Sequence, residues 1–106
     1  MLVEIVIEEK VIKDYKTKEK KELILRKIDI KRQDLKLNQE TIYLNILPWN
    51  LSNICKMAMK DEYNKKFNEN ISLEQFNQAK AIKLYSQYNY DVLQKIKKLE
   101  KELEKL

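Results

Sequence analysis

The last third of the chain, residues 72–106, carries a repeat that restricts it to a long helix. Apolar residues recur there at alternating spacings of three and four, the heptad pattern of a helix that packs along one narrow stripe. The stripe positions are Ile82, Tyr85, Asn89, Val92, Ile96, Leu99, Leu103 and Leu106. Lysines and glutamates fill most positions around the final leucines, so the apolar surface suits a single partner helix better than a broad core.

Two partners fit this stripe. A second copy of the chain would make a homodimer whose interface consists of Tyr85, Asn89, Val92, Ile96, Leu99 and Leu103. An asparagine in the stripe is typical of parallel two-stranded coils, where it fixes the register, and Lys95 could then meet the partner's Glu100. Alternatively, the stripe packs on the chain's own sheet or first helix. We favour the homodimer.

The start of the long helix is marked by Ser72 and Gln75, which have the spacing of a capping box. One helix is therefore expected over 72–106. The segment Tyr88–Asp91 contains poor helix formers, and Asp91 could cap a separate final helix, so a break near residues 89–91 stays open.

The first 47 residues are rich in valine and isoleucine and predict β-strands. Strands are expected over 2–12, 22–30 and 41–47, the last because Ile42, Leu44 and Ile46 alternate with polar neighbours. Residues 16–20 are predicted to form the hairpin turn between the first two strands. Pro48 ends the sheet, and Asn50 is the expected N-cap of a first helix over 50–68.

This order of elements predicts an α+β fold in one domain, residues 1–106. An N-terminal three- or four-stranded antiparallel β-meander is followed by two α-helices, the last of them long and coiled-coil-like. The chain has no apolar run near the roughly 18 residues of a membrane span and no signal-peptide pattern. A lone cysteine, Cys55, favours a reducing compartment, and we expect a cytoplasmic protein in which Cys55 is buried.

Missing residue types exclude most catalytic motifs. The chain contains no glycine and no histidine, so phosphate-binding glycine loops, nucleophile elbows and histidine-dependent nucleophiles are ruled out. Asp14 followed by Glu19-Lys20-Lys21 matches the letters of a metal-dependent nuclease motif, but so charged a chain produces such matches by chance. We therefore expect no enzyme activity, no cofactor and no metal.

Basic residues concentrate in one segment. Residues 10–36 carry a net charge of +6, whereas the rest of the chain carries −1. The candidate binding residues for nucleic acid or a partner are Lys13, Lys16, Lys18, Lys20, Lys21, Arg26, Lys27, Lys31 and Arg32. On the expected β-hairpin they would meet a phosphate backbone or an acidic protein surface. The competing interpretation is a solvated hairpin whose lysines prevent edge-to-edge pairing.

Tyr88 and Tyr90 are candidate partner contacts, or else pack against Trp49 or the sheet. The leading hypothesis is a small, basic, dimeric binding protein that engages nucleic acid or a nucleoprotein complex. The alternative is a phage- or plasmid-encoded inhibitor or adaptor, anti-CRISPR-like, that binds a host protein such as a defence nuclease. A composition rich in lysine, asparagine and isoleucine is typical of AT-rich coding sequence and hints at a mobile element.

Overall fold

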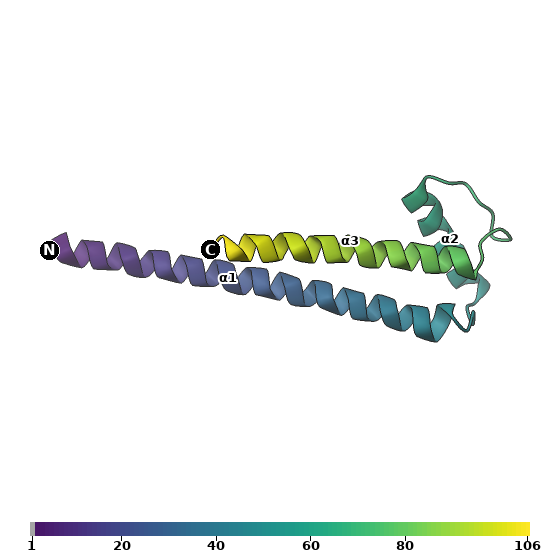
Figure 1. Ribbon diagram of the computed structural model, residues 1–106, viewed down its shortest axis with the longest axis horizontal. Coiled ribbons are helices and arrows are strands. Elements are labelled where there is room, and N and C mark those ends of the chain that lie inside the picture. The colour runs from purple at the N-terminus through teal and green to yellow at the C-terminus, as the bar shows by residue number, and fades with distance from the viewer. Residues whose placement is uncertain (1) are drawn as a thin grey trace.

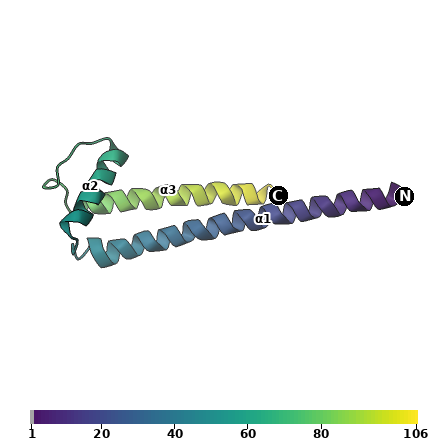
Figure 2. The same ribbon diagram turned by 180° about the vertical axis from the view of Figure 1, so that it is seen from behind.

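The protein is a long helical hairpin closed at one end by a short third helix (Figures 1 and 2). The computed structural model describes the backbone of residues 2–106 and the side chains of residues 13–106. Its elements are α1 (Leu2–Thr41), a π-helical turn η1 (Ile42–Ile46), α2 (Asn53–Phe67) and α3 (Gln78–Glu104). No strand occurs within residues 2–106, so the predicted α+β fold with a β-meander is wrong.

Helix α1 replaces the expected strands 2–12 and 22–30, and the π-helical turn η1 replaces most of the expected strand 41–47. Nothing interrupts it, because the first proline is Pro48 and the chain has no glycine. The expected hairpin tip, residues 16–20, consists of lysines, a threonine and a glutamate, and lysine and glutamate are good helix formers. The apolar residues of this segment also fit a helix, since Ile24, Ile28 and Leu35 recur at spacings of four and seven.

α1 and α3 run antiparallel, side by side over most of the length of α3 (Figures 1 and 2). Ile28 of α1 and Ile96 of α3 are both buried. Arg32 forms an ion pair with Glu100 across the two helices at 3.8 Å, between side chains that are both largely exposed. In this structure the heptad stripe therefore packs within the chain, on α1, which occupies the segment expected to form the sheet and not the helix expected over 50–68.

The π-helical turn changes the phase of the first helix at its end. The Leu47 N–H donates to the Ile42 carbonyl at 2.8 Å, a bond that spans five residues instead of four. This extra residue lets Ile46 point inward, where it is fully buried. Gln78 closes the end of the turn, because its Nε2 donates to the carbonyl oxygens of Ile46 and Leu47.

α2 begins at a serine cap and ends at a left-handed residue. The Ser52 hydroxyl accepts a hydrogen bond from the Cys55 N–H, so the N-cap is Ser52 and not Asn50. At the other end Asn68 has φ 52°, the left-handed conformation that asparagine tolerates better than most residues. Cys55 is exposed on this helix, which corrects the expectation that it is buried.

α3 starts later than the capping box indicated. Ser72 and Gln75 do exchange the hydrogen bonds of a capping box, but the turn that they close is separate from the helix. The N-cap of α3 is Asn77, whose side chain accepts from the Lys80 N–H at 2.9 Å. From Gln78 the helix runs through residues 88–91 to Glu104 without a break.

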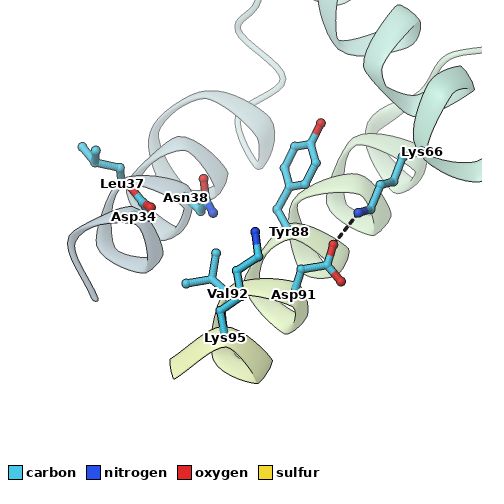
Figure 3. Close-up of a pocket in the computed structure, with 8 residues that line it drawn as sticks. All are labelled: Asp34, Leu37, Asn38, Lys66, Tyr88, Asp91, Val92 and Lys95. Atoms are coloured by element: carbon cyan, nitrogen blue, oxygen red, sulfur yellow. Dashed lines mark ion pairs between the residues drawn. The ribbon is translucent and has the colours of Figure 1, made fainter. Parts of the chain in front are cut away.

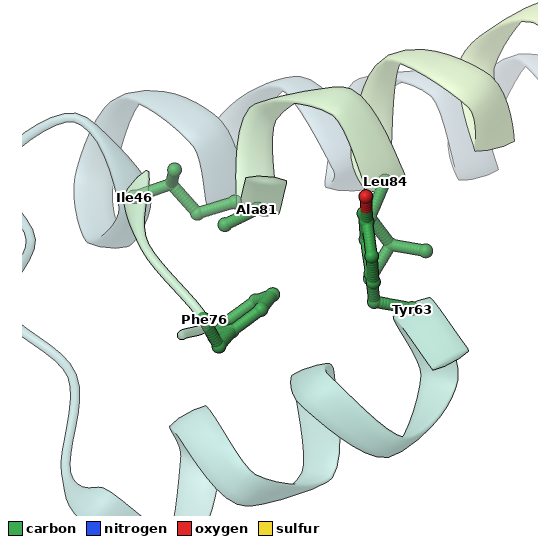
Figure 4. Close-up of a cluster of buried hydrophobic side chains, with 5 residues drawn as sticks. All are labelled: Ile46, Tyr63, Phe76, Ala81 and Leu84. Carbon is green, nitrogen blue, oxygen red and sulfur yellow. The ribbon is translucent and has the colours of Figure 1, made fainter. Parts of the chain in front are cut away.

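The main core lies at the closed end, where α2 folds back onto the hairpin (Figure 4). It is a cluster of buried side chains from the π-helical turn, from α2, from the loop before α3 and from the start of α3. The members are Ile46, Tyr63, Phe76, Ala81 and Leu84. Trp49 covers this cluster with its ring centroid 6.0 Å from that of Phe76, as expected for a lid on the core.

The molecule is elongated, with extents of 76 × 27 × 21 Å. Glu102, Lys105 and Leu106 at the end of α3 lie beside Lys20 and Leu23 of α1. The backbone of α1 continues beyond this point to Leu2, so that its first part extends past α3 (Figure 1). We call residues 2–19 the overhang.

Candidate functional site

Lysines from all three helices gather along one side of the hairpin. Lys66 of α2 lines a groove with Lys95 and Lys98 of α3, and Lys105 lies near Lys20 at the other end of α3. Lys27 falls on the same line of α1, seven residues after Lys20 and seven before Asp34, which lines the groove near Lys66. The basic face is defined as Lys20, Lys27, Lys66, Lys95, Lys98 and Lys105.

Three acids lie on the same side and lower its charge. Asp34, Asp91 and Glu102 line the same grooves as these lysines, which leaves a net charge of +3. Asp91 is already engaged within the molecule, since it forms an ion pair with Lys66 and accepts a hydrogen bond from Gln87 at 3.1 Å. Hydrogen bonds from Lys66 and Gln87 hold the pKa of Asp91 below its ordinary value of 3.8. Asp91 thus stays ionised and ties α2 to α3.

Tyr88 forms the floor of the basic face between α2 and α3. Its hydroxyl donates to Glu62 at 3.1 Å, and the Lys66 ammonium lies 6.0 Å from its ring centroid. Partial burial, together with the negative charge of Glu62, raises the pKa of Tyr88 to about 12. The ring of Tyr85 packs edge-on against it at 5.5 Å. Tyr88 is therefore a neutral packing residue whose hydroxyl joins two helices.

The groove over Tyr88 is open rather than enclosed (Figure 3). It has a volume of about 390 Å³, and Asp34, Leu37, Val92 and Lys95 are among the residues that line it. A shallow, charged groove of this kind suits a flexible polyanion or a protein side chain better than a small apolar ligand, which needs an enclosed pocket. Within the described part of the chain, no three histidine, cysteine, aspartate or glutamate residues lie close enough together to hold a metal ion.

The predicted binding lysines lie on a helix instead of a hairpin, and the structure spreads them around it. Of the nine, Lys20 and Lys27 belong to the basic face. Lys31 is half-buried, and Arg32 is paired with Glu100. Lys13, Lys16, Lys18, Lys21 and Arg26 are exposed. The expected basic β-hairpin does not exist, and the concentration of charge that it implied is divided among several sides of α1.

The stripe residues lie within the packed part of α3, with Tyr85 at the closed-end core. Ile96 is buried, and Tyr85, Asn89, Val92, Leu99 and Leu103 are half-buried. Asn89 lowers the stability of the fold, because its Oδ1 is buried and accepts no hydrogen bond from any described residue. A dimer built on this stripe would have to displace α1.

Of the two candidate contact tyrosines, only Tyr90 remains available on the surface. Its side chain is more than half exposed, whereas Tyr88 is held by Glu62. The residues that match the nuclease motif, Asp14 and Glu19–Lys21, all lie on one helix. The adjacent strands that such a metal site requires are absent there.

Sequence reasoning missed Lys66, Lys95, Lys98 and Lys105 as binding residues. The spacing of Lys95 and Lys98 could have placed them near each other on a helix. Nothing in the sequence joins them to Lys66 or Lys20, because that depends on how the three helices pack.

Comparisons with known proteins identify no relative of this chain. No protein-family model, no curated protein and no solved structure matches the chain. Among the described helices, none has the length and apolar content needed to cross a membrane.

Proposed function

We propose that the protein is a non-enzymatic cytoplasmic binding protein that engages the phosphate backbone of nucleic acid through the basic face. The observation that carries this proposal is the convergence of lysines from α1, α2 and α3 on one side of the hairpin. Lysine is a flexible point charge that binds phosphate without reading bases. The expected binding is therefore independent of sequence. An exposed thiol at Cys55 is compatible with a reducing compartment.

The length of the basic face also suits a linear polyanion. Lys66 lies near the closed end of the hairpin, and Lys20 and Lys105 lie where α3 ends. Phosphates follow one another along each nucleic-acid strand, so several of these lysines could contact one strand at once. Each contact releases a counterion, and the resulting affinity depends strongly on salt.

The first test measures the binding of a fluorescent duplex and a fluorescent single strand over a salt series. With about five phosphate contacts, affinity should fall roughly 10³-fold between 50 and 200 mM salt. Neutralising two lysines of the face, K95Q/K98Q, should reduce the salt slope by about two. The matched control is K97Q/K101Q, which changes the same charge on the same helix but outside the basic face, and it should change the slope less. Equal effects of the two double variants, or no binding at low salt, would contradict the proposal.

A second candidate function, an inhibitor or adaptor that binds a host protein, is favoured by the closed end of the molecule. Large apolar side chains are exposed there on the π-helical turn, the loop after it and α2. They are Tyr43, Leu44, Leu47, Ile54 and Met57, and Ile54 is 82% exposed. Exposed apolar groups that cluster in one region are typical of protein contact surfaces.

The two functions separate in a pulldown from a bacterial lysate with and without nuclease treatment. Capture through nucleic acid should disappear after nuclease treatment and in the K95Q/K98Q variant. Direct capture of a protein should survive nuclease treatment and be lost in I54D, which places a charge in the exposed apolar region. I54D should leave binding to purified nucleic acid unchanged.

A further inference from the structure

A second heptad stripe runs along α1 outside its buried contact with α3, and its members Leu23 and Leu37 lie at the edges of open grooves beside α3. Leu23, Ile30 and Leu37 recur every seven residues and are 53%, 57% and 60% exposed. Continued in both directions at spacings of three and four, the stripe consists of Leu2, Ile5, Glu9, Ile12, Lys16, Glu19, Leu23, Arg26, Ile30, Gln33 and Leu37. Every member from Lys16 onward is exposed, so nothing in the chain covers it there. We call this set the outer stripe.

The overhang supplies the first half of the outer stripe, and its backbone runs beyond the end of α3 (Figure 1). α3 ends beside Lys20 and Leu23, and α1 continues for about 27 Å beyond Lys20 at 1.5 Å per residue. Isolated helices of this length are marginally stable in water, particularly when they are rich in valine and isoleucine. The overhang is therefore a helix that requires a partner.

We propose that this partner is the overhang and outer stripe of a second copy, arranged antiparallel about a twofold axis between residues 17 and 18. In that register each stripe position from Leu2 to Gln33 meets a position whose number brings the sum of the two to 35. Apolar residues then oppose apolar residues, with Ile5 at the partner's Ile30 and Ile12 at the partner's Leu23. The charged positions are matched as well, with Glu9 at the partner's Arg26 and Lys16 at the partner's Glu19.

Shifting the chains by one heptad in either direction destroys this match. A sum of 28 places Glu9 opposite the partner's Glu19 and Ile12 opposite the partner's Lys16. A sum of 42 places Lys16 opposite the partner's Arg26 and Glu19 opposite the partner's Leu23. Like charges or an unpaired charge would then be desolvated in the interface, which costs more than the apolar contacts recover. Of these three registers, only the sum of 35 keeps like charges and unpaired charges out of the interface, and it places Leu2 opposite the partner's Gln33.

A parallel pair is the main competing arrangement. It would favour the flanks of the interface, where Glu8 could meet the partner's Lys13 and Glu22 the partner's Lys27. In the stripe itself, however, Glu9, Lys16, Glu19 and Arg26 would each face their own copy. Exposed flanking pairs contribute little because water and salt screen them, whereas like charges within the outer stripe must give up their hydration. The charges of the outer stripe therefore determine the orientation, and they favour the antiparallel pair.

The hairpins leave room for this dimer. α3 packs on the face of α1 that carries Ile28, whereas the described members of the outer stripe are exposed, with Leu23 and Leu37 at the edge beside α3. The shared segment ends at Gln33, before the groove near Lys66. The two closed ends would project in opposite directions. With about 48 Å of overlap at 1.5 Å per residue, two molecules of 76 Å would make a rod of roughly 100 Å. This inference does not depend on nucleic-acid binding, although Lys20 and Lys27 of the basic face border the outer stripe.

The test is charge exchange at one matched pair, followed by sedimentation equilibrium. R26E places a glutamate opposite the partner's Glu9 twice per dimer and should raise the dimer dissociation constant at least about tenfold. E9R should do the same. The double variant E9R/R26E restores opposite charges and should recover wild-type affinity. The control K36E makes the same charge change just outside the overlap and should leave the dissociation constant unchanged. Circular dichroism checks that each variant remains helical.

Cross-linking distinguishes the two orientations. In a C55S background, E9C and R26C proteins are prepared separately and then oxidised alone or mixed. The antiparallel register predicts a disulfide-linked dimer only in the mixture, because in either homodimer the two thiols are about 25 Å apart along the axis. Cross-linking of each protein alone would establish the parallel pair instead. A wild-type particle of 12.9 kDa at high micromolar concentration, or no rescue in E9R/R26E, would overturn the proposal.

Discussion

At the scale of single residues, the described part of α3 contains one buried side-chain polar atom that makes no hydrogen bond. Asn89 lies in the stripe of α3, and its Oδ1 is buried without a hydrogen-bond donor among the described residues. The cost of desolvating an amide oxygen is not recovered there. The sequence had given Asn89 a different role, fixing the register of a parallel dimer, and in this fold its neighbour is instead the chain's own α1.

Replacing Asn89 with leucine should therefore stabilise the protein. Removal of the unsatisfied oxygen and added apolar contact with α1 should raise the free energy of unfolding by about 1 kcal/mol. Urea denaturation followed by circular dichroism measures the change. The conservative variant N89Q, which retains an amide, serves as the control and should give no such gain. A loss of stability in N89L would indicate that Asn89 makes a bond with water or with a partner.

At the scale of elements, two adjacent capping motifs precede α3, and only the second caps the helix itself. The box of Ser72 and Gln75 closes an isolated turn, whereas the side chain of Asn77 accepts a hydrogen bond from the Lys80 N–H in the first turn of the helix. The helix dipole and its unsatisfied donors are concentrated at the true N-terminus. Asn77 is therefore the residue that holds the first turn of α3.

The variant N77A should lower the free energy of unfolding by about 1 kcal/mol, the usual cost of a lost N-cap. S72A should cost less, since its N-cap bond to Gln75 is long at 3.4 Å and lies outside the helix. Thermal and urea unfolding of both variants provide the measurement. If S72A proved the more damaging of the two, the helix would begin where the sequence alone had placed it.

The elements differed in how well sequence could predict them. α2 and α3 were found approximately because the chain marks their limits with Pro48, Asn68 and the serine and asparagine caps. α1 was assigned to strands because isoleucines at spacings of four satisfy both a period of two and a period of 3.6. Ile42 and Ile46 illustrate this, since both face inward but Leu44 between them is exposed. An alternating strand would have placed all three on one side.

The candidate site was less predictable than the fold. The basic segment was correctly located in the sequence, but its lysines surround a helix, and only tertiary packing selects Lys20 and Lys27 for the basic face. Lys66 reaches that face through its ion pair with Asp91, a contact between residues far apart in the sequence. Charge counting along the chain cannot detect such a contact.

At the scale of the whole molecule, shape is the most direct prediction. A compact chain of this length would have a radius of gyration of about 13 Å. The hairpin has a backbone radius of gyration of 21.6 Å. Small-angle scattering, extrapolated to the low concentrations at which a dimer dissociates, should give a value near the second figure. A value near 13 Å would show that the hairpin folds back on itself in solution.

In the proposed dimer, the position of the overhang also sets a limit on how far self-association can proceed. The helical end that projects from each chain and the strip that receives it lie on one line of one helix, and a twofold axis uses both at the same time. Once two chains have joined, neither has a vacant copy of either surface to offer a third. Because the twofold dimer uses both surfaces of each chain, it cannot grow into a fibre, as a chain with an unpaired association surface could.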